Sequence, residues 1–138
     1  MTTHHLDSWK QYLNDDDYNF LVQYIENIKN NTPNDKMIIL SGPSGSGKST
    51  LQQNIASYLG EEMCGNFPMS GEIIYNEGIK SLGFFSGIHE ISRSKKNNQA
   101  IINLIRYKQS LIADTNHIER VNNKILEHSR VIQMNHVF

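Results

Sequence analysis

Apolar and polar positions alternate along the chain with two periods, which predict helices and strands in turn. Residues 18–28 carry apolar side chains at helical spacing, and residues 51–59 do so again before Gly60, a natural helix C-cap. Between them, residues 37–40 form a continuous apolar run, which is typical of a buried parallel strand. The first half of the chain is therefore expected to fold as helix, strand and helix.

The second half also contains predicted strands and a predicted helix, with weaker signals. Apolar runs at residues 82–85 and 131–134 predict two further buried strands, and residues 72–75 predict a short one. Apolar positions at residues 101–105 predict a helix that is capped by the asparagines at 97–98. Strands that alternate with helices favour an α/β fold with a parallel sheet, in which ligands bind at the carboxyl ends of the strands.

Residues 110–125 have a pattern of their own. They show partial strand-like alternation around Asn122 and Asn123, a plausible turn. This pattern predicts a β-hairpin before the last strand.

The segment between the first strand and the following helix is a complete phosphate-binding loop. It matches G-x-x-x-x-G-K-[ST] and consists of Gly42, Pro43, Ser44, Gly45, Ser46, Gly47, Lys48, Ser49 and Thr50. Its glycines let backbone N–H groups turn toward an anion, which also faces the positive end of the helix dipole. Lys48 supplies a charge for the β- and γ-phosphates, and the Ser49 hydroxyl can ligate Mg²⁺. The loop therefore predicts ATP and Mg²⁺ as cofactors.

Length, net charge and composition limit the possible domain organisation, partners and cellular compartment. A chain of 138 residues is expected to form a single P-loop ATPase domain, residues 1–138, with a loosely ordered segment at residues 1–14. Its formal net charge of -1 means that any nucleic-acid contact must come from a local patch. Cys64 is the sole cysteine, which excludes a disulfide framework within the chain and fits a reducing compartment. No apolar stretch approaches the ~20 residues of a membrane span, so an intracellular, cytoplasmic protein without a membrane partner is expected.

The loop, its flanking helices and strands, and the order of the later elements resemble the ATPase core of superfamily 3 helicases. The nearest type is the primase-helicase of poxviruses, giant viruses, phages and plasmids. The resemblance runs from residue 18 to Asn135, which closes the last strand, and the loop is its strongly specific part. It implies a P-loop NTPase, AAA+-like core that couples ATP hydrolysis to movement along single-stranded DNA, or RNA, as a homo-oligomeric, usually hexameric, ring. The setting that it implies is viral or mobile-element DNA replication.

The resemblance also implies roles for individual residues. Lys48 and Ser49 would hold phosphate and Mg²⁺, and Glu90 would be the Walker B acid that completes the metal site or activates water. Asn135 would be the sensor that orients the attacking water, a positioning role that phosphoryl transfer needs. The predicted hairpin would enter the ring channel, where Arg120 and Lys124 would contact the nucleic-acid backbone.

Two departures from the family pattern modify this interpretation. The position just after the apolar strand usually carries the acid, but here it reads Ser86-Gly87, and Glu90 follows later. The sequence also ends just after Asn135, whereas family members place an arginine finger beyond that point. The chain is thus expected to be a truncated or degenerate core.

Two other functions stay open at this point. A small-molecule P-loop kinase, such as a nucleoside or nucleotide kinase, needs an arginine-rich lid, and residues 61–81 contain Glu72 but no arginine. A non-catalytic nucleotide-binding module would retain the intact loop without the acid and the finger. The fold alone does not choose between these functions, because P-loop sheets carry many chemistries.

Overall fold

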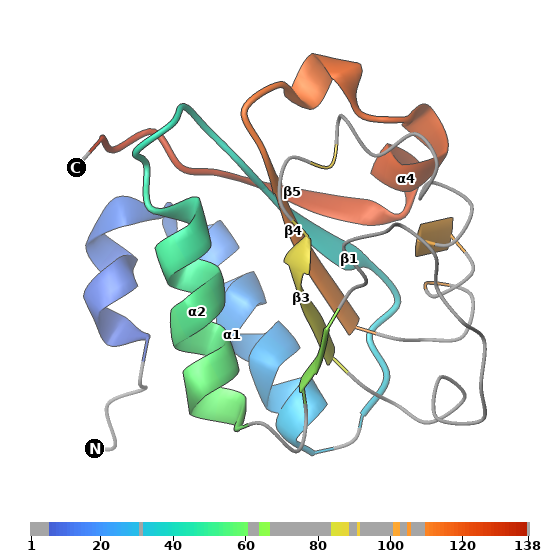
Figure 1. Ribbon diagram of the computed structural model, residues 1–138. Coiled ribbons are helices and arrows are strands. Elements are labelled where there is room, and N and C mark those ends of the chain that lie inside the picture. Colours follow the sequence, from blue (N-terminus) through green and yellow to red (C-terminus); the bar gives the residue numbers. More distant parts are fainter. Residues whose placement is uncertain are drawn as a thin grey trace.

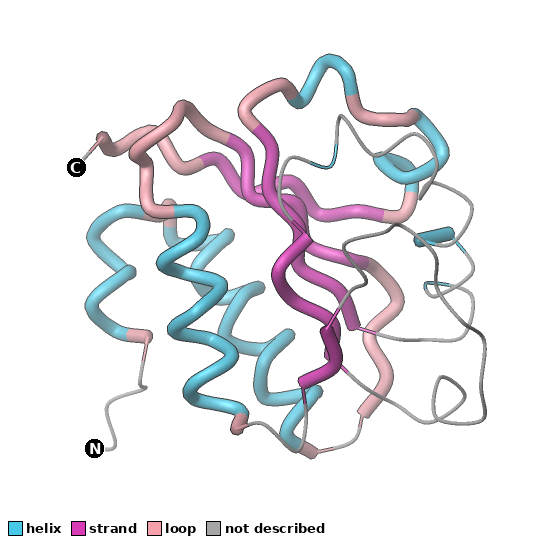
Figure 2. Tube along the Cα trace, viewed as in Figure 1, coloured by secondary structure: helices cyan, strands magenta, loops and turns pink. Residues whose placement is uncertain are grey.

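A computed structural model describes residues 6–30, 32–60, 64–66, 84–88, 91, 101–102, 105 and 110–137. These residues form an α/β fold around a parallel sheet of five strands in the order β2-β3-β4-β1-β5 (Figures 1 and 2). The strands are β1 (Met37–Ser41), β2 (Cys64–Asn66), β3 (Phe84–Ile88), β4 (Ser110–Thr115) and β5 (Ser129–Gln133). The helices that lie wholly within the described residues are α1 (Asp15–Lys29), α2 (Lys48–Leu59), α4 (Asn123–Glu127) and the 3₁₀-helices η1 (Asp7–Tyr12) and η6 (Ile118–Arg120). The predicted α/β class with a parallel sheet is confirmed.

Two hydrophobic layers cover the two faces of the sheet. Strand β1 shows the division, since Ile38 and Leu40 pack under α1, α2 and η1, whereas Met37 and Ile39 face the other way. The second layer includes Ile125 of α4 and three buried helical residues, Ile101, Ile102 and Ile105. Figure 1 shows α1 and α2 together on one side of the sheet and α4 on the other. Both faces of β1 are buried, which explains its continuous apolar sequence.

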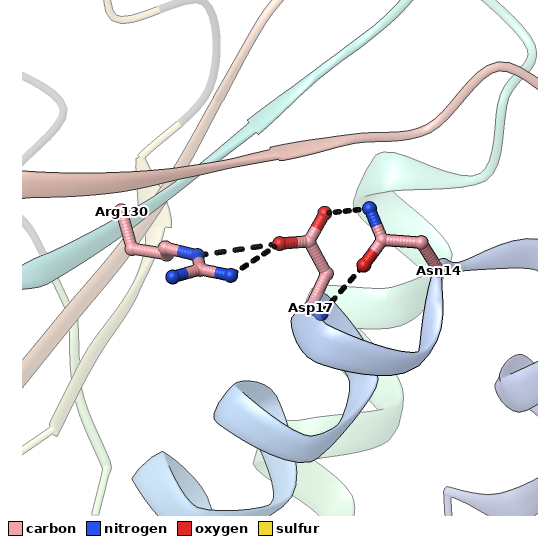
Figure 3. A network of polar contacts seen from close by, with 3 residues as sticks. All are labelled: Asn14, Asp17 and Arg130. Atoms are coloured by element: carbon pink, nitrogen blue, oxygen red, sulfur yellow. Dashed lines mark hydrogen bonds and ion pairs between the residues drawn. The ribbon is translucent and has the colours of Figure 1, made fainter.

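Helix α1 begins where its sequence favours a start. The side-chain oxygen of Asn14 accepts a hydrogen bond from the Asp17 backbone N–H at 2.7 Å, and three acidic residues fill the first turn. Asp17 also lies 3.0 Å from Arg130 of β5, so a single carboxylate links the helix start to the edge strand (Figure 3).

Residues 6–13, which belong to the segment expected to be loose, pack in the core. Leu6, Trp9 and Leu13 are buried in the layer under α1 and α2. The Tyr18 hydroxyl donates a hydrogen bond to Asp7 and ties η1 to α1. Burial, together with this contact to Asp7, raises the pKa of Tyr18 to about 12. Apolar residues spaced three or four apart in a short segment were the signal for this packing.

A closed polar network joins α1 to the amino end of β4. The Tyr24 hydroxyl accepts from the Leu111 N–H at 2.9 Å and donates to the Leu111 carbonyl at 3.2 Å. The Asn34 amide donates to the Tyr24 carbonyl at 3.2 Å and to the Ser110 hydroxyl at 2.9 Å. Burial raises the pKa of Tyr24 above its ordinary value, so the hydroxyl stays neutral and available for both bonds.

The predicted β-hairpin is wrong. Residues 118–120 form η6, and Asn122 caps helix α4 by accepting from the Lys124 N–H at 2.8 Å. Strand β4 lies between β3 and β1, both parallel to it, so its two edges are already occupied. The apolar residues that suggested alternation, Val121 and Ile125, instead pack together in the second layer. A four-residue spacing satisfies a short helix as well as a strand, and the local capping decides.

The predicted helices at 18–28 and 51–59 correspond to α1 and α2. The runs at 37–40, 82–85 and 131–134 correspond to β1, β3 and β5. The expected strand at 72–75 and the cap at 97–98 lie outside the described residues.

Candidate functional site

The phosphate-binding loop leaves the carboxyl end of β1 and leads directly into α2. The Gly42 N–H donates to the Thr115 carbonyl at 3.3 Å, and the Met134 N–H donates to the Ser41 carbonyl at 2.7 Å. A Cβ on Gly42 would lie 2.1 Å from the Met134 carbonyl oxygen, so no other residue fits without movement. The start of the loop is thus held between the ends of β4 and β5.

Two more glycines shape the turn of the loop. Gly45 and Gly47 have φ angles of 83° and 89°, in the left-handed region that side chains disfavour. Gly47 precedes the first residue of α2 and stands at its N-cap. The backbone therefore bends around a point in front of the helix N-terminus, where an anion is favoured.

Lys48 lies inside this bend. It is 7% exposed, and its ammonium group donates to the carbonyls of Gly42 and Pro43, each at 2.8 Å. A further bond of 3.3 Å reaches the Ser46 hydroxyl. The positive charge is therefore held at the loop by backbone oxygens, beside the position that the motif assigns to phosphate.

A polar cavity of about 320 Å³ opens next to Lys48. One wall comes from the loop and the first turn of α2, including Ser49, and the other from Asp114 and Asn116 at the end of β4. Cationic, hydroxyl, carboxylate and amide groups thus meet at one edge of the sheet. This is the edge where ligands bind in parallel α/β folds.

A second cavity of about 490 Å³ adjoins the first, since Gly45, Gly47 and Thr50 line both. Its far wall is η1, with the aromatic side chains of Trp9 and Tyr12. The Tyr12 ring also packs against His136, with ring centroids 4.8 Å apart. Residues from both ends of the described chain therefore meet beside the loop.

Asp114 and Asn116 were missed in the sequence. Asp114 is 5% exposed, and the side-chain amide of Gln52 on α2 donates to its Oδ2 at 3.0 Å. The available signal was the apolar run of residues 111–113 followed by Asp114, Thr115 and Asn116. The predicted β-hairpin obscured this signal, because it assigned residues 110–125 to a pair of strands and not to one buried strand that ends in polar residues.

The expected site residues outside the loop line neither of the two cavities or lie outside the described residues. Asn135 is exposed two residues past β5, which flanks β1 on the side opposite β4. Arg120 and Lys124 are exposed in η6 and α4, after the end of β4. Glu90 lies outside the described residues. Its nearest described strand residue is Ile88, the last of β3, which pairs with Ala113 of β4.

No protein-family model and no curated protein sequence matches the chain. Solved structures with a similar fold include C. elegans PCH-2, with a TM-score of 0.58 and 12% identity. Two others are the FIGL-1 AAA domain in complex with ADP, with a TM-score of 0.55 and 12% identity, and the Thermotoga maritima RuvB Holliday junction branch migration motor, with a TM-score of 0.55 and 20% identity. These matches cover 92%, 92% and 91% of this chain, in that order, but 45%, 55% and 46% of the other chains, so this chain spans about half their length.

None of the helices in the described part of the chain has the length and apolar character needed to cross a lipid bilayer. The structural neighbours support an AAA+-like P-loop core and do not single out the superfamily 3 type. The chain has the α/β P-loop fold of AAA+ ATPase domains.

Proposed function

We propose that this chain is the ATP-binding and ATP-hydrolysing core of an AAA+-type P-loop ATPase. The observation that carries the proposal is the complete phosphate loop, with Lys48 enclosed in it, at the mouth of a polar cavity that continues into an aromatic one. The cavities of about 320 and 490 Å³ are of the size that small-ligand sites have.

The two cavities suggest how a nucleotide would bind. The phosphates would lie in the polar cavity against the loop N–H groups and the Lys48 ammonium group. The base would lie in the second cavity against Trp9 and Tyr12, whose rings offer flat apolar surfaces for stacking. A single ligand would then span η1, the loop and α2.

The residues at the polar cavity also fit Mg²⁺. Ser49 offers a hydroxyl oxygen and Asp114 a carboxylate, the oxygen ligands that this ion prefers. When bound, the ion would neutralise the charge that develops on the phosphates. Asn116, an amide at the same edge, and Glu90 and Asn135, which the resemblance assigns, are the candidates to orient or activate the attacking water.

The finer proposal is a superfamily 3-type helicase core that acts on single-stranded DNA, or RNA, as a ring. The sequence resemblance supports it, and Arg120 and Lys124 are its exposed basic candidates for backbone contact. Both residues follow β4, the strand that adjoins β1, so that such a contact would be coupled to the nucleotide site through β4. Lys95 and Lys96, which could assist, lie outside the described residues.

Binding of a fluorescent ATP analogue to Lys48→Ala tests the central proposal. We expect affinity to fall by at least about tenfold, because the variant loses the charge that faces the phosphates. Lys36→Ala is the matched control, since Lys36 is exposed just before β1 and away from both cavities. Equal affinity of folded Lys48→Ala and the control would refute nucleotide binding through the loop.

ATPase assays separate the remaining functions. Turnover that single-stranded DNA stimulates, and that Arg120→Ala with Lys124→Ala abolishes, is expected for the helicase type. Turnover that depends on a nucleoside acceptor would indicate a kinase, and binding without turnover would indicate a non-catalytic module.

A further inference from the structure

One wall of the aromatic cavity is a single face of α2. The residues that α2 and its N-cap contribute are Gly47, Thr50 and Asn54, spaced three and four positions apart, so they follow one another along that face. Gly47 stands at the phosphate-binding turn, and Asn54 lies roughly 10 Å farther along the helix axis, at 1.5 Å per residue. The cavity therefore extends from the phosphate-binding turn to a side-chain amide.

The side-chain amide of Asn54 is available to a ligand. Asn54 is half-buried, and the structure gives its amide no hydrogen bond to any other residue of the described part of the chain. Two other amides nearby are engaged. Gln52 donates to Asp114 at 3.0 Å, away from this cavity. Gln11 of η1 donates to the Ser8 carbonyl at 3.2 Å. Asn54 thus brings a free donor and a free acceptor to the cavity wall.

The opposite wall supplies flat surfaces but little selectivity. The rings of Trp9 and Tyr12 lie 6.0 Å apart with an angle of 69° between their planes, so they meet edge to face. A base that stacks on either ring is held flat, and its edge is left for hydrogen bonds. Stacking tolerates any base, because every base has a π-face. The choice among bases must therefore come from the polar groups that meet the edge.

We infer that Asn54 is the specificity-determining residue of this cavity and that it selects adenine. The inference rests on the proposed nucleotide-binding function and adds the base preference of the same site. Adenine presents a donor, N6, beside an acceptor, N7, and an asparagine amide meets both, since its Oδ1 accepts from N6 and its Nδ2 donates to N7. The corresponding edge of guanine carries two acceptors, O6 and N7, which arginine or lysine satisfies. Among the described residues that line the cavity there is neither a cation nor a carboxylate.

Competition binding to the full chain tests the inference without any substitution. A fluorescent ATP analogue that is labelled on the ribose is displaced by ATP, by GTP and by 7-deaza-ATP, in which a carbon replaces N7. ATP should bind about fivefold or more tightly than either competitor, because each competitor loses half of the paired contact with the amide.

The variant Asn54→Ala connects this preference to the residue. It should weaken ATP binding by a similar factor and bring the ratio of ATP to 7-deaza-ATP affinities close to one, while affinity for inorganic triphosphate stays unchanged. A purely structural role of Asn54 would instead weaken all of these ligands alike. Gln53→Ala is the matched control, since Gln53 is the neighbouring amide on α2 but is exposed and lines neither cavity. If Asn54→Ala does not fold, Asn54→Asp keeps the shape, removes the Nδ2 donor and should lower the same ratio.

The outcomes separate the inference from the function on which it rests. Wild-type protein that binds neither ATP nor the fluorescent analogue would overturn the proposed function. Wild-type protein that binds ATP, but binds 7-deaza-ATP or GTP equally well, would overturn the base assignment alone. A folded Asn54 variant that retains the wild-type ratios would show that another residue selects the base.

Discussion

The two ends of the sheet hold equally buried polar groups that serve different purposes. At the amino end, Tyr24, Asn34 and Ser110 are 2%, 8% and 4% exposed and bond to one another or to the backbone. At the carboxyl end, Lys48 and Asp114 are 7% and 5% exposed, yet both line a cavity. Burial of polar groups therefore does not mark a site by itself. What marks the site is a cavity beside those groups and a backbone bent around it.

Replacement of Gly42 should have the largest effect at the carboxyl end. In Gly42→Ala the new Cβ would meet the Met134 carbonyl at 2.1 Å, so either the loop or the chain after β5 must move. We expect nucleotide binding to be lost and the free energy of unfolding to fall by about 1–3 kcal/mol, as for other overpacked positions. Titration with the fluorescent ATP analogue and urea denaturation measure the two effects.

Gly60→Ala is the matched control for this change. Gly60 also has a positive φ of 88°, but a Cβ there meets nothing within 4 Å. The variant should lose about 1–3 kcal/mol of stability, because a φ of 88° with a ψ of 156° is a backbone conformation that is largely restricted to glycine, and it should keep its nucleotide affinity. If both variants bind equally well, the close approach of the loop to β5 is not needed for the site.

Tyr24→Phe, at the amino end of the sheet, should lower stability without changing nucleotide affinity. It leaves the buried Leu111 N–H without its 2.9 Å partner, which should cost about 1–3 kcal/mol of unfolding free energy. Nucleotide affinity should not change, because neither cavity is lined by Tyr24. Denaturation and ATP-analogue titration on the same sample check both statements, and a weakened affinity would mean that the two ends of β4 are coupled.

The same comparison explains which parts of the fold and of the site could be predicted from the sequence. The order of strands and helices around the loop could be predicted, because period and glycine placement are local properties of residues 18–60. The partner strand of β1 could not, since register across β4 depends on contacts between residues more than 70 positions apart. Asp114 is therefore invisible as a site residue until β4 is placed beside the loop. The predicted hairpin was wrong for a related reason. The spacing of Val121 and Ile125 fits a strand as well as a helix, and the packing of both residues in the second hydrophobic layer favours the helix.

A moderate effect is expected where the aromatic cavity meets the loop. Tyr12→Ala removes one ring of the surface proposed for the base, and base–aromatic stacking is worth about 1–3 kcal/mol. We expect nucleotide affinity to fall by about tenfold, with inorganic triphosphate affinity unchanged. Trp9 is the sole tryptophan and lines the same cavity, so its fluorescence should change when ATP binds. An ATP titration that leaves this fluorescence unaltered would place the base elsewhere.

The smallest effect should come from the contact between α1 and β5, which belongs to neither end of the sheet. Arg130 and Asp17 lie 3.0 Å apart, but the Arg130 side chain is 37% exposed, so water screens the pair. A double-mutant cycle with Asp17→Asn and Arg130→Gln should give a coupling free energy of about 0.5–1 kcal/mol, measured by urea denaturation. The coupling should shrink in 1 M salt, where the screening length is only about 3 Å. Nucleotide affinity should stay constant through the cycle, because this network braces a helix start and not the loop. A coupling free energy well above that range would mean that the pair is effectively buried. The contact between Asp17 and Arg130 would then stabilise the fold in the same way as the buried polar network at the amino end of the sheet.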